Sequence, residues 1–284
     1  MSRIVDIDNA ERAAEKEEAL AAWLRACGRV AIGFSGGVDS AYLAVVARRT
    51  LGGENVLAII GRSASYPAEQ WAAARRVADA FDVTVLELDT DEMNDPRYAA
   101  NPSNRCYFCK SELWGKVVPE ATQRGFGTVV DGTNADDVGG HRPGMQAANE
   151  HAVASPLAEL GFSKSEIRER SRALGLPTWQ QPASPCLSSR LPYGTSVTPE
   201  RLHLVEQAER AVRALGVTGD LRVRYHDDVA RVELAPAELT TWLEPRRAES
   251  LRAAVVSAGF PRVALDLRGF RSGSLNVLHG VTTA

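Results

Sequence analysis

The feature that most constrains the fold of this chain is a pair of glycines at the point where an apolar segment gives way to a helical one. Residues 30–34 have the length and composition of a buried strand, and residues 41–49 have helical composition. Between them lies Ser35-Gly-Gly-Val-Asp-Ser40. Glycines let the main chain approach a ligand closely, and the first amide groups of a helix lack partners within it. The sequence therefore predicts an anion-binding turn.

Strands and helices alternate through the N-terminal part of the chain. Further apolar runs at 56–60, 83–88 and 128–131 predict strands, and residues 11–26, 67–81, 111–124 and 163–174 predict helices. This alternation indicates an α/β fold with a parallel sheet and helices on both faces. In such sheets a ligand binds beyond the carboxyl ends of the strands, where the strand order reverses.

The pattern changes after residues 176–195, which are rich in Pro, Ser and Gly and predict a linker or a functional loop. Thr198-Pro199 then predicts a helix start, followed by two short strands, a helix and a strand. We therefore expect two domains, a parallel-sheet domain at 1–190 and a small α+β domain at 191–284.

Charge and composition exclude several classes of protein. The net charge is −3, and a dedicated nucleic-acid binder would carry a basic excess. No apolar run approaches the roughly 18 residues that span a bilayer, and the N-terminus has no apolar signal core. We expect a cytoplasmic protein with neither a membrane nor a nucleic acid as partner. Its four cysteines are too few for a disulfide scaffold.

The glycine turn carries an acidic residue, Asp39, which limits the kinds of anion that the turn can bind. The segment lacks the Gly-Lys-Ser/Thr of a P-loop and the glycine spacing of a dinucleotide fingerprint. A carboxylate would repel a bare phosphate, but it can hold a Mg²⁺ ion that bridges phosphates. The alternative is a plain tight turn with a helix cap.

Three cysteines form a second candidate site. Cys106-Tyr-Phe-Cys109 is a close pair, and Cys186 lies far downstream. The set could be a zinc site short of one ligand, a redox pair, or a [4Fe–4S] cluster whose fourth iron stays open. Cys186 could also be a nucleophile that supplies its own sulfur. Spacing alone leaves these alternatives open.

A predicted hairpin supplies a third candidate site. A two-residue loop at Asp227-Asp228 would pair Arg222 with Glu233 and Arg224 with Arg231. Alternation then places three cations and one anion on one face. Such a face suits phosphate, although a solvated strand face is the alternative.

The glycine turn matches the pyrophosphate loop of the ATP-pyrophosphatase superfamily, and longer motifs resemble the LarE family. These motifs are Asn101-Pro-Ser-Asn-Arg-Cys-Tyr-Phe-Cys-Lys110, Asp131-Gly-Thr-Asn-Ala-Asp-Asp137 with Arg142-Pro-Gly144, Ser184-Pro-Cys-Leu-Ser-Ser-Arg-Leu-Pro-Tyr-Gly194, Arg222-Val-Arg224, and Gly269-Phe-Arg-Ser-Gly-Ser-Leu-Asn276. The resemblance runs in the family's order from about Val30 to Asn276.

The resemblance implies an ATP-dependent sulfurtransferase that adenylates a carboxylate of pyridinium-3,5-biscarboxylic acid mononucleotide and converts it to a thiocarboxylate. This is a step toward the nickel-pincer nucleotide cofactor. One type in the family sacrifices a single cysteine, and the other has three cysteines and is similar to cluster-dependent thiolases. This chain resembles the second type. The implied cofactors are ATP, Mg²⁺ and a [4Fe–4S] cluster, and the implied assembly is a homo-oligomer. The sulfide donor is not defined.

The resemblance also assigns residues. It implies nucleotide contacts at Ser35, Gly36, Gly37, Asp39, Ser40, Ile60, Thr133 and Asp136, and substrate contacts at Arg222, Arg224 and Glu233. It implies catalytic roles for Asp39, Cys106, Cys109 and Cys186, with the three cysteines as cluster ligands. On sequence alone, an acidic pair such as 136–137 is more often a solvated cap. Arg190 and Arg271 could also meet phosphates, with a surface ion pair as the alternative for each. Competing functions are an amide-forming ligase and a tRNA thiolase of the same superfamily.

Overall fold

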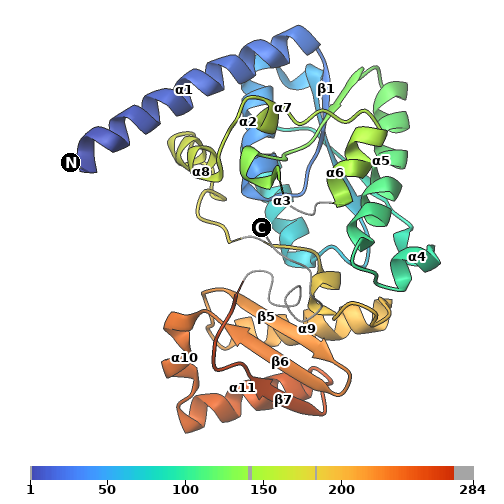
Figure 1. Ribbon diagram of the computed structural model, residues 1–284, viewed down its shortest axis with the longest axis vertical. Coiled ribbons are helices and arrows are strands. Elements are labelled where there is room, and N and C mark those ends of the chain that lie inside the picture. The colour runs from blue at the N-terminus through green and yellow to red at the C-terminus, as the bar shows by residue number, and fades with distance from the viewer. Residues whose placement is uncertain (1, 140–142, 183, 272–284) are drawn as a thin grey trace.

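The chain forms two sheets, of which the first carries the glycine turn (Figure 1). The computed structural model describes residues 2–139, 143–182 and 184–271. The first sheet has the strand order β3-β2-β1-β4, and every pairing in it is parallel. Its strands are β1 (Val30–Gly33), β2 (Val56–Arg62), β3 (Val85–Asp89) and β4 (Thr128–Val130). The predicted parallel α/β sheet is confirmed.

Helices cover both faces of this sheet. One face packs against α1 (Ser2–Cys27), α2 (Val38–Leu51), α3 (Ala68–Ala80) and α8 (Lys164–Ala173), and the other against α5 (Arg105–Gln123) and α6 (Pro143–Glu150). Successive side chains of β1 and β2 enter opposite cores, because strand side chains alternate. Ile32 and Ile60 thus join the core under α2, while Ala31 and Ile59 join the core under α5.

Short helical segments complete this part of the chain. They are α4 (Pro96–Ala99), α7 (Pro156–Glu159), and the 3₁₀ segments η1 (Gly53–Asn55), η2 (Glu92–Asn94), η3 (Ala135–Asp137) and η4 (Leu187–Arg190). Across the described residues, no helix combines the length and the apolar character needed to cross a bilayer.

The strand order places a topological switch beside β1. The chain runs outward from β1 to β2 and β3, and then returns to the opposite side of β1 as β4. The loops after β1 and β4 therefore lie next to each other at the carboxyl edge of the sheet, on the two sides of the switch. A crevice at such a switch is where open α/β sheets bind ligands.

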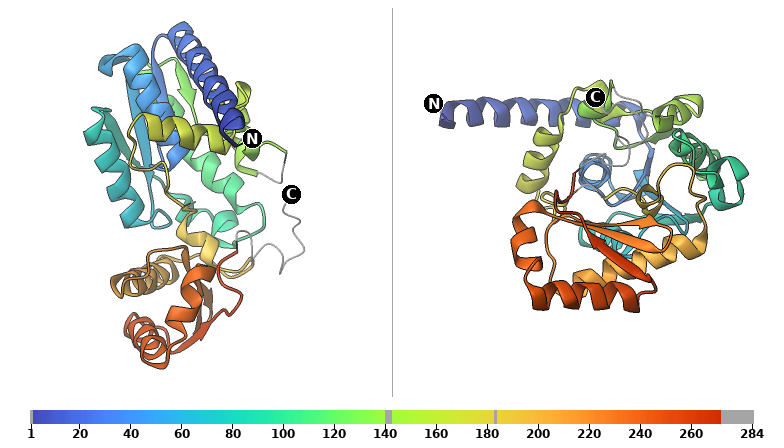
Figure 2. Two further views of the ribbon diagram at one scale, coloured as in Figure 1. Left: turned by 90° about the vertical axis from the view of Figure 1, so that its left-hand side faces the viewer. Right: turned by 60° about the horizontal axis from the view of Figure 1, so that its bottom comes forward.

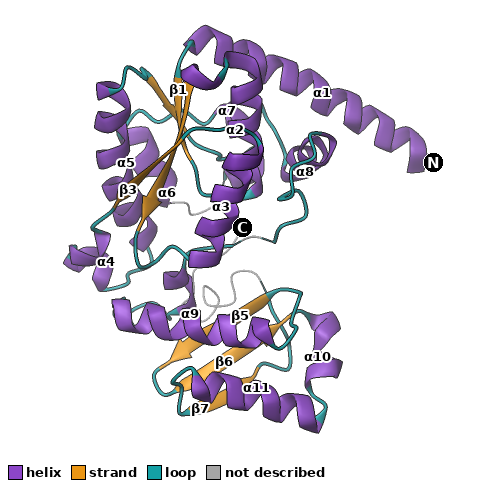
Figure 3. Cartoon of the chain, turned by 180° about the vertical axis from the view of Figure 1, so that it is seen from behind, coloured by secondary structure: helices purple, strands orange, loops and turns teal. Residues whose placement is uncertain are grey.

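The C-terminal sheet is smaller and mixed (Figure 3). Strand β6 pairs antiparallel with β5 and parallel with β7. The elements are α9 (Pro199–Ala214), β5 (Leu221–His226), β6 (Val229–Leu234), α10 (Pro236–Trp242), α11 (Pro245–Ser257) and β7 (Arg262–Leu265). Two helices separate β6 from β7 where the sequence predicted one. Pro236 and Pro245 each begin a helix, because proline suits the first helical position but not the interior.

The core of the C-terminal sheet reaches into the N-terminal half of the chain. Tyr98 and Leu187 are buried in it, and Phe108 packs against it. Main-chain hydrogen bonds reinforce the junction, with Gly194 donating to Asn101 at 2.9 Å and residue 197 donating to residue 99 at 2.8 Å. The segment around α4 and the start of α5 thus lies between the two sheets (Figure 2).

Candidate active site

Residues 35–40, here called the phosphate loop, join β1 to α2. Gly36 adopts a positive φ of 71°, and Gly37 is the extended N-cap of α2. A Cβ added to Gly36 would lie 2.5 Å from the Cβ of Ala74, so only glycine fits the turn. The Ser35 and Ser40 hydroxyls lie 3.1 Å apart, and the Ser40 hydroxyl donates to the Gly37 carbonyl at 3.2 Å. The loop is therefore held in shape by its own residues and presents the start of α2.

Asp39 lies in the first turn of α2 and has a cationic partner that the sequence did not reveal. The Lys164 ammonium, at the start of α8, donates to one carboxylate oxygen of Asp39. The other oxygen, Oδ1, is buried without a hydrogen-bond partner. Burial raises the pKa of Asp39, the Lys164 charge opposes that rise, and the nearby Asp137 adds to it. An orphaned, partly desolvated carboxylate oxygen is the kind of ligand that fits Mg²⁺.

The loop after β4 packs against the phosphate loop. A Cβ on Gly132 would lie 2.8 Å from the Ser40 amide nitrogen, so the two loops meet closely. The Thr133 amide and hydroxyl both donate to Asp131, at 3.0 and 2.8 Å. The Asp136 side chain is exposed and accepts from the Lys164 amide at 2.8 Å. The cap expected as the alternative for Asp136 is thus present, and it positions the helix that carries Lys164.

Ile60 lies at the second strand, as expected, with its side chain in the core. It is 1% exposed and packs beneath α2. Its side chain is therefore enclosed by the protein, so a nucleotide contact at this position remains a prediction for the main chain.

Cys106, Cys109 and Cys186, here called the thiol trio, come from two segments. Helix α5 begins at Arg105, not at Ser111 as predicted, so Cys106 and Cys109 lie three residues apart in its first turns. That spacing puts both on one face of the helix. Cys186 is the N-cap of η4. Cys106 is exposed, and the other two are half-buried.

The three thiols lie near enough to interact electrostatically. Burial raises the pKa of Cys106 and of Cys109, and in each case the neighbouring Cys186 raises it further. Protein atoms surround the Cys106 thiol closely although the residue as a whole is exposed. The donor set, three thiols from two segments, matches a three-thiolate cluster in chemistry. Among the described residues, however, no three His, Cys, Asp or Glu side chains already stand around a common metal position.

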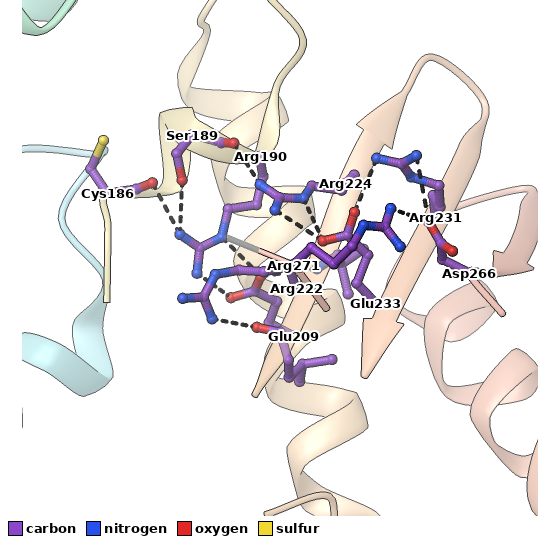
Figure 4. A network of polar contacts seen from close by, with 12 residues as sticks. Cys186, Ser189, Arg190, Glu209, Arg222, Arg224, Arg231, Glu233, Asp266 and Arg271 are labelled. Carbon is purple, nitrogen blue, oxygen red and sulfur yellow. Dashed lines mark hydrogen bonds and ion pairs between the residues drawn. The ribbon is translucent and has the colours of Figure 1, made fainter. Parts of the chain in front are cut away.

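A cluster of arginines lies beside Cys186 (Figure 4). The arginine cluster comprises Arg190, Arg222, Arg224, Arg231 and Arg271, together with the acids Glu209, Glu233 and Asp266. The predicted register is confirmed, with Arg222 opposite Glu233 and Arg224 opposite Arg231. Arg222 and Arg224 are each 5% exposed and Glu233 is fully buried, so this is not a solvated strand face.

Ion pairs fix most of this cluster. Glu233 accepts from Arg224 at 2.9 Å and from Arg231 at 3.0 Å. Arg190 forms a bidentate pair with Glu209 at 2.9 Å, and its Nη1 donates to the Cys186 carbonyl at 3.1 Å. Burial, followed by the charge of Arg190, lowers the pKa of Arg222 to about 10. With five cations and three acids, the cluster has an excess of positive charge, which an anionic ligand would offset.

One loop joins the phosphate loop to the Cys186 turn. The Tyr66 hydroxyl and the Gln70 amide both donate to the Ser35 carbonyl at 2.9 Å. The Ser65 carbonyl accepts from the Leu187 amide at 2.8 Å. Residues 65–70 therefore contact both the phosphate loop and the Cys186 turn. On the far side of the turn, Arg224 donates to the Ser189 carbonyl at 2.9 Å.

Sequence reasoning missed two buried or half-buried cations, Lys164 and Arg105. Lys164 lies inside the capping box of Ser163 and Glu166, at the start of the helix that the sequence predicted over 163–174. Arg105 directly precedes Cys106 and is 5% exposed. The sequence signal that could have revealed Lys164 and Arg105 is that each lies within or directly beside a recognised motif. Arg142 and residues 272–276 of the family motifs lie outside the described residues.

Comparisons with known proteins agree with this geometry. The NAD synthase family model matches residues 17–102, which include the phosphate loop. An uncharacterized protein of Synechocystis sp. is 45% identical over 248 residues, covering 87% of this chain and 92% of that protein. The pyridinium-3,5-bisthiocarboxylic acid mononucleotide synthase of Lactiplantibacillus plantarum is 34% identical over 263 residues, covering 93% of this chain and 94% of that enzyme.

More distant matches share only part of their length. The glutamine-hydrolyzing GMP synthase of Parafrankia sp. is 28% identical over 214 residues, which are 66% of this chain but 39% of that enzyme. The match to the Lactiplantibacillus enzyme, in contrast, runs from end to end of both proteins and spans both sheets. The chain is therefore a member of the LarE family of ATP-dependent enzymes with a pyrophosphate loop.

Proposed function

We propose that this enzyme activates a carboxylate of pyridinium-3,5-biscarboxylic acid mononucleotide with ATP and replaces an oxygen of that carboxylate with sulfur. The full-length similarity to a pyridinium-3,5-bisthiocarboxylic acid mononucleotide synthase supports the substrate class. The observation that carries the reaction is the placement of the Cys186 turn. Hydrogen bonds tie it through residues 65–70 to the phosphate loop, and through Ser189 to the arginine cluster.

The first step forms an acyl adenylate. A substrate carboxylate oxygen attacks the α-phosphorus of ATP, and the bond to pyrophosphate breaks. The phosphate loop would bind the departing phosphates through the start of α2. Asp39 would hold the Mg²⁺ ion that neutralises their charge, using the oxygen that lacks a partner. Lys164, now paired with Asp39, is placed to supply a second positive charge.

The second step transfers sulfur. A sulfur anion attacks the acyl carbon, a carbon–sulfur bond forms, and AMP leaves with the carbon–oxygen bond's electrons. Cys106, Cys109 and Cys186 would hold a [4Fe–4S] cluster, which leaves one iron open to carry that sulfur. The arginine cluster would bind the substrate's phosphate, since Arg222 and Arg224 are cations kept in a largely desolvated setting.

The test is turnover by anaerobically purified protein with ATP, sulfide and the mononucleotide. Thiocarboxylate is followed by mass spectrometry, and pyrophosphate by a coupled assay. Asp39→Asn should lower pyrophosphate release by about 10²–10³-fold, because it removes the negative charge that would hold the Mg²⁺ ion on the phosphates. Asp79→Asn, an exposed carboxylate on α3, is the matched control. Pyrophosphate release at the normal rate in Asp39→Asn would refute the role of the phosphate loop.

The sulfur source is tested on the same samples. Iron and acid-labile sulfide should fall in Cys106→Ala, Cys109→Ala and Cys186→Ala. An intact mass that drops by one H₂S at Cys186 after a single turnover would instead identify that cysteine as the sacrificed donor. Amide formation from ammonia in place of sulfur would favour the ligase alternative.

A further inference from the structure

Arg105 is the buried cation that the proposed function leaves unassigned. It is the first residue of α5 and directly precedes Cys106. It is 5% exposed. Its Nη1 donates to the Asn101 side-chain oxygen and to the Ser188 carbonyl, the latter at 3.0 Å. The guanidinium thus links the segment that carries Cys106 to the turn that carries Cys186.

The partners of Arg105 differ from those of comparable buried arginines. Arg190 and Arg224 are buried to a similar degree, and each forms a close pair with a carboxylate. Within the part of the chain that the structure describes, the hydrogen bonds of Arg105 go to neutral oxygens, and no carboxylate forms an ion pair with it. A buried charge without a counter-charge costs several kcal/mol, so a nearby anion is expected.

The thiol trio is where that anion would lie. Arg105 directly precedes Cys106, and the Ser188 carbonyl that accepts its hydrogen bond lies two residues after Cys186. The guanidinium therefore stands between the two segments that carry the thiols. Cys109, three residues further along the helix, lies near the buried carboxyl group of Glu92. Of the two cysteines in the first turns of α5, Cys106 is therefore the one that directly follows the guanidinium-bearing residue.

The neighbouring contacts hold this guanidinium in place. Asn101 is fully buried with a φ of 55°, and its amide nitrogen donates to the carbonyls of Pro192 and Thr195 at 2.7 and 2.9 Å. The Tyr98 hydroxyl lies 2.6 Å from that of Ser188. Arg105 is thus a rigid cation, because both segments that it joins are themselves fixed.

We propose that Arg105 is the counter-charge of the thiol trio, a positioning residue that holds anionic sulfur beside Cys106 and Cys186 during sulfur transfer. The inference deepens the proposed function and rests on it. Thiolates and an added sulfide carry net negative charge into a half-buried site, and one fixed guanidinium offsets part of it. Cys106 is the exposed member of the trio.

The charge is tested in the metal-free protein, without turnover. Each cysteine is alkylated under anaerobic conditions with iodoacetate, which is anionic, or iodoacetamide, which is neutral and similar in size. Mass spectrometry gives the rate ratio of the two reagents for each cysteine. Arg105→Met should lower the ratio at Cys106 by about tenfold, because a focused positive potential raises the local concentration of anions. Arg105→Lys, which keeps the charge, should retain most of the ratio.

The matched control is Arg124→Met at the other end of α5, where the arginine is exposed and bound to Glu120. It should leave the ratio unchanged. If Arg105→Met leaves the ratio at Cys106 unchanged, the counter-charge is refuted. If Arg105→Met fails to fold, the wild-type protein still tests the proposal. Its iodoacetate-to-iodoacetamide rate ratio must be higher at Cys106 than at Cys109, which lies near Glu92. Equal ratios would overturn the proposal.

A second readout links the charge to sulfur. After anaerobic reconstitution, Arg105→Met should bind less than half of the wild-type sulfide per chain, and Arg105→Lys should restore it. Normal sulfide content in Arg105→Met would contradict the proposal. The alkylation ratio does not depend on ATP or on the mononucleotide. A failure to form thiocarboxylate with a normal ratio would therefore refute the proposed function and leave the charge intact.

Discussion

The phosphate loop and the arginine cluster are both suited to bind phosphate, but they are built in opposite ways. The phosphate loop is six consecutive residues whose shape depends on main-chain geometry, with Gly36 at a positive φ and Gly37 as a helix cap. The arginine cluster gathers side chains from five segments, namely η4, α9, β5, β6 and residues 266–271, and depends on buried charge pairs. Added side-chain volume should therefore disrupt the phosphate loop, whereas the loss of a charge should disrupt the arginine cluster.

The largest effect should come from removing the buried anion of the arginine cluster. Glu233→Gln leaves Arg224 and Arg231 without their shared carboxylate, which is fully buried. We expect a loss of about 3–5 kcal/mol in the free energy of unfolding, measured by urea denaturation, since the buried Arg224 and the half-buried Arg231 lose their counter-charge. Glu249→Gln, whose pair with Arg252 is exposed, should change little. Equal losses in the two variants would contradict this account.

Added side-chain volume at Gly36 should destabilise the phosphate loop. Gly36→Ala must adopt a φ of 71° and place its Cβ 2.5 Å from that of Ala74. We expect a loss of about 2–4 kcal/mol in stability and weak ATP binding by calorimetry, from strain and overpacking together. Gly175→Ala has a similar φ of 75° and open space around its Cβ, so it reports the strain alone. If both variants lose the same stability, the close contact with Ala74 is unimportant.

A milder charge change should separate the two phosphate sites in function. Arg222→Lys keeps the charge and loses the planar fork, so the KM for the mononucleotide should rise about tenfold while the KM for ATP stays constant. Steady-state kinetics with each substrate varied in turn measure both. Arg210→Lys, exposed on α9, is the control. A parallel rise in the KM for ATP would mean that the arginine cluster does not discriminate between the two ligands.

The smallest expected effect is a loss of stability at low pH through Glu166. This residue lies on α8, the helix that also carries Lys164, the partner of Asp39. Burial disfavours the charge of Glu166, but hydrogen bonds from Lys16, Ser163 and Arg12 outweigh it and lower its pKa to about 2. Since the folded pKa lies below the unfolded one, this stabilisation is present above about pH 4.5 and is lost as the pH falls toward 2.

Between about pH 5 and pH 3, the Tm of the wild type should therefore fall about 2–4 °C further than that of Glu166→Gln. Scanning calorimetry at each pH measures both. An identical fall in the two proteins would show that Glu166 carries no acid-sensitive share of the stability.

The same contrast explains which parts of the site the sequence could predict. The phosphate loop is local, so six residues between a strand and a helix were enough to place Ser35, Asp39 and Ser40. The hairpin register was predictable because a two-residue turn fixes every cross-strand pair, Arg222 with Glu233 included. Alternation of strands and helices likewise predicted the parallel sheet.

The missed features depend on contacts between distant segments. Lys164 reaches Asp39 across 125 residues, and Arg105 reaches Ser188 across 83. No pattern within a short window encodes such pairs. The start of α5 was predicted at residue 111, whereas the helix begins at Arg105, and Asn104 at its N-cap position makes no side-chain capping hydrogen bond that would mark the start. The burial of Arg222 and Arg224 was equally hidden, since charged residues are usually exposed.

The pairing of Lys164 with Asp39 has a consequence for the order in which ligands enter. A free divalent ion on the unpartnered oxygen of Asp39 would lie close to the ammonium group on the other oxygen, and the two positive charges would repel each other. A metal ion that arrives on a nucleotide brings its own negative groups, which offset that repulsion. The empty enzyme should therefore ignore free magnesium and accept the metal–nucleotide complex as a unit.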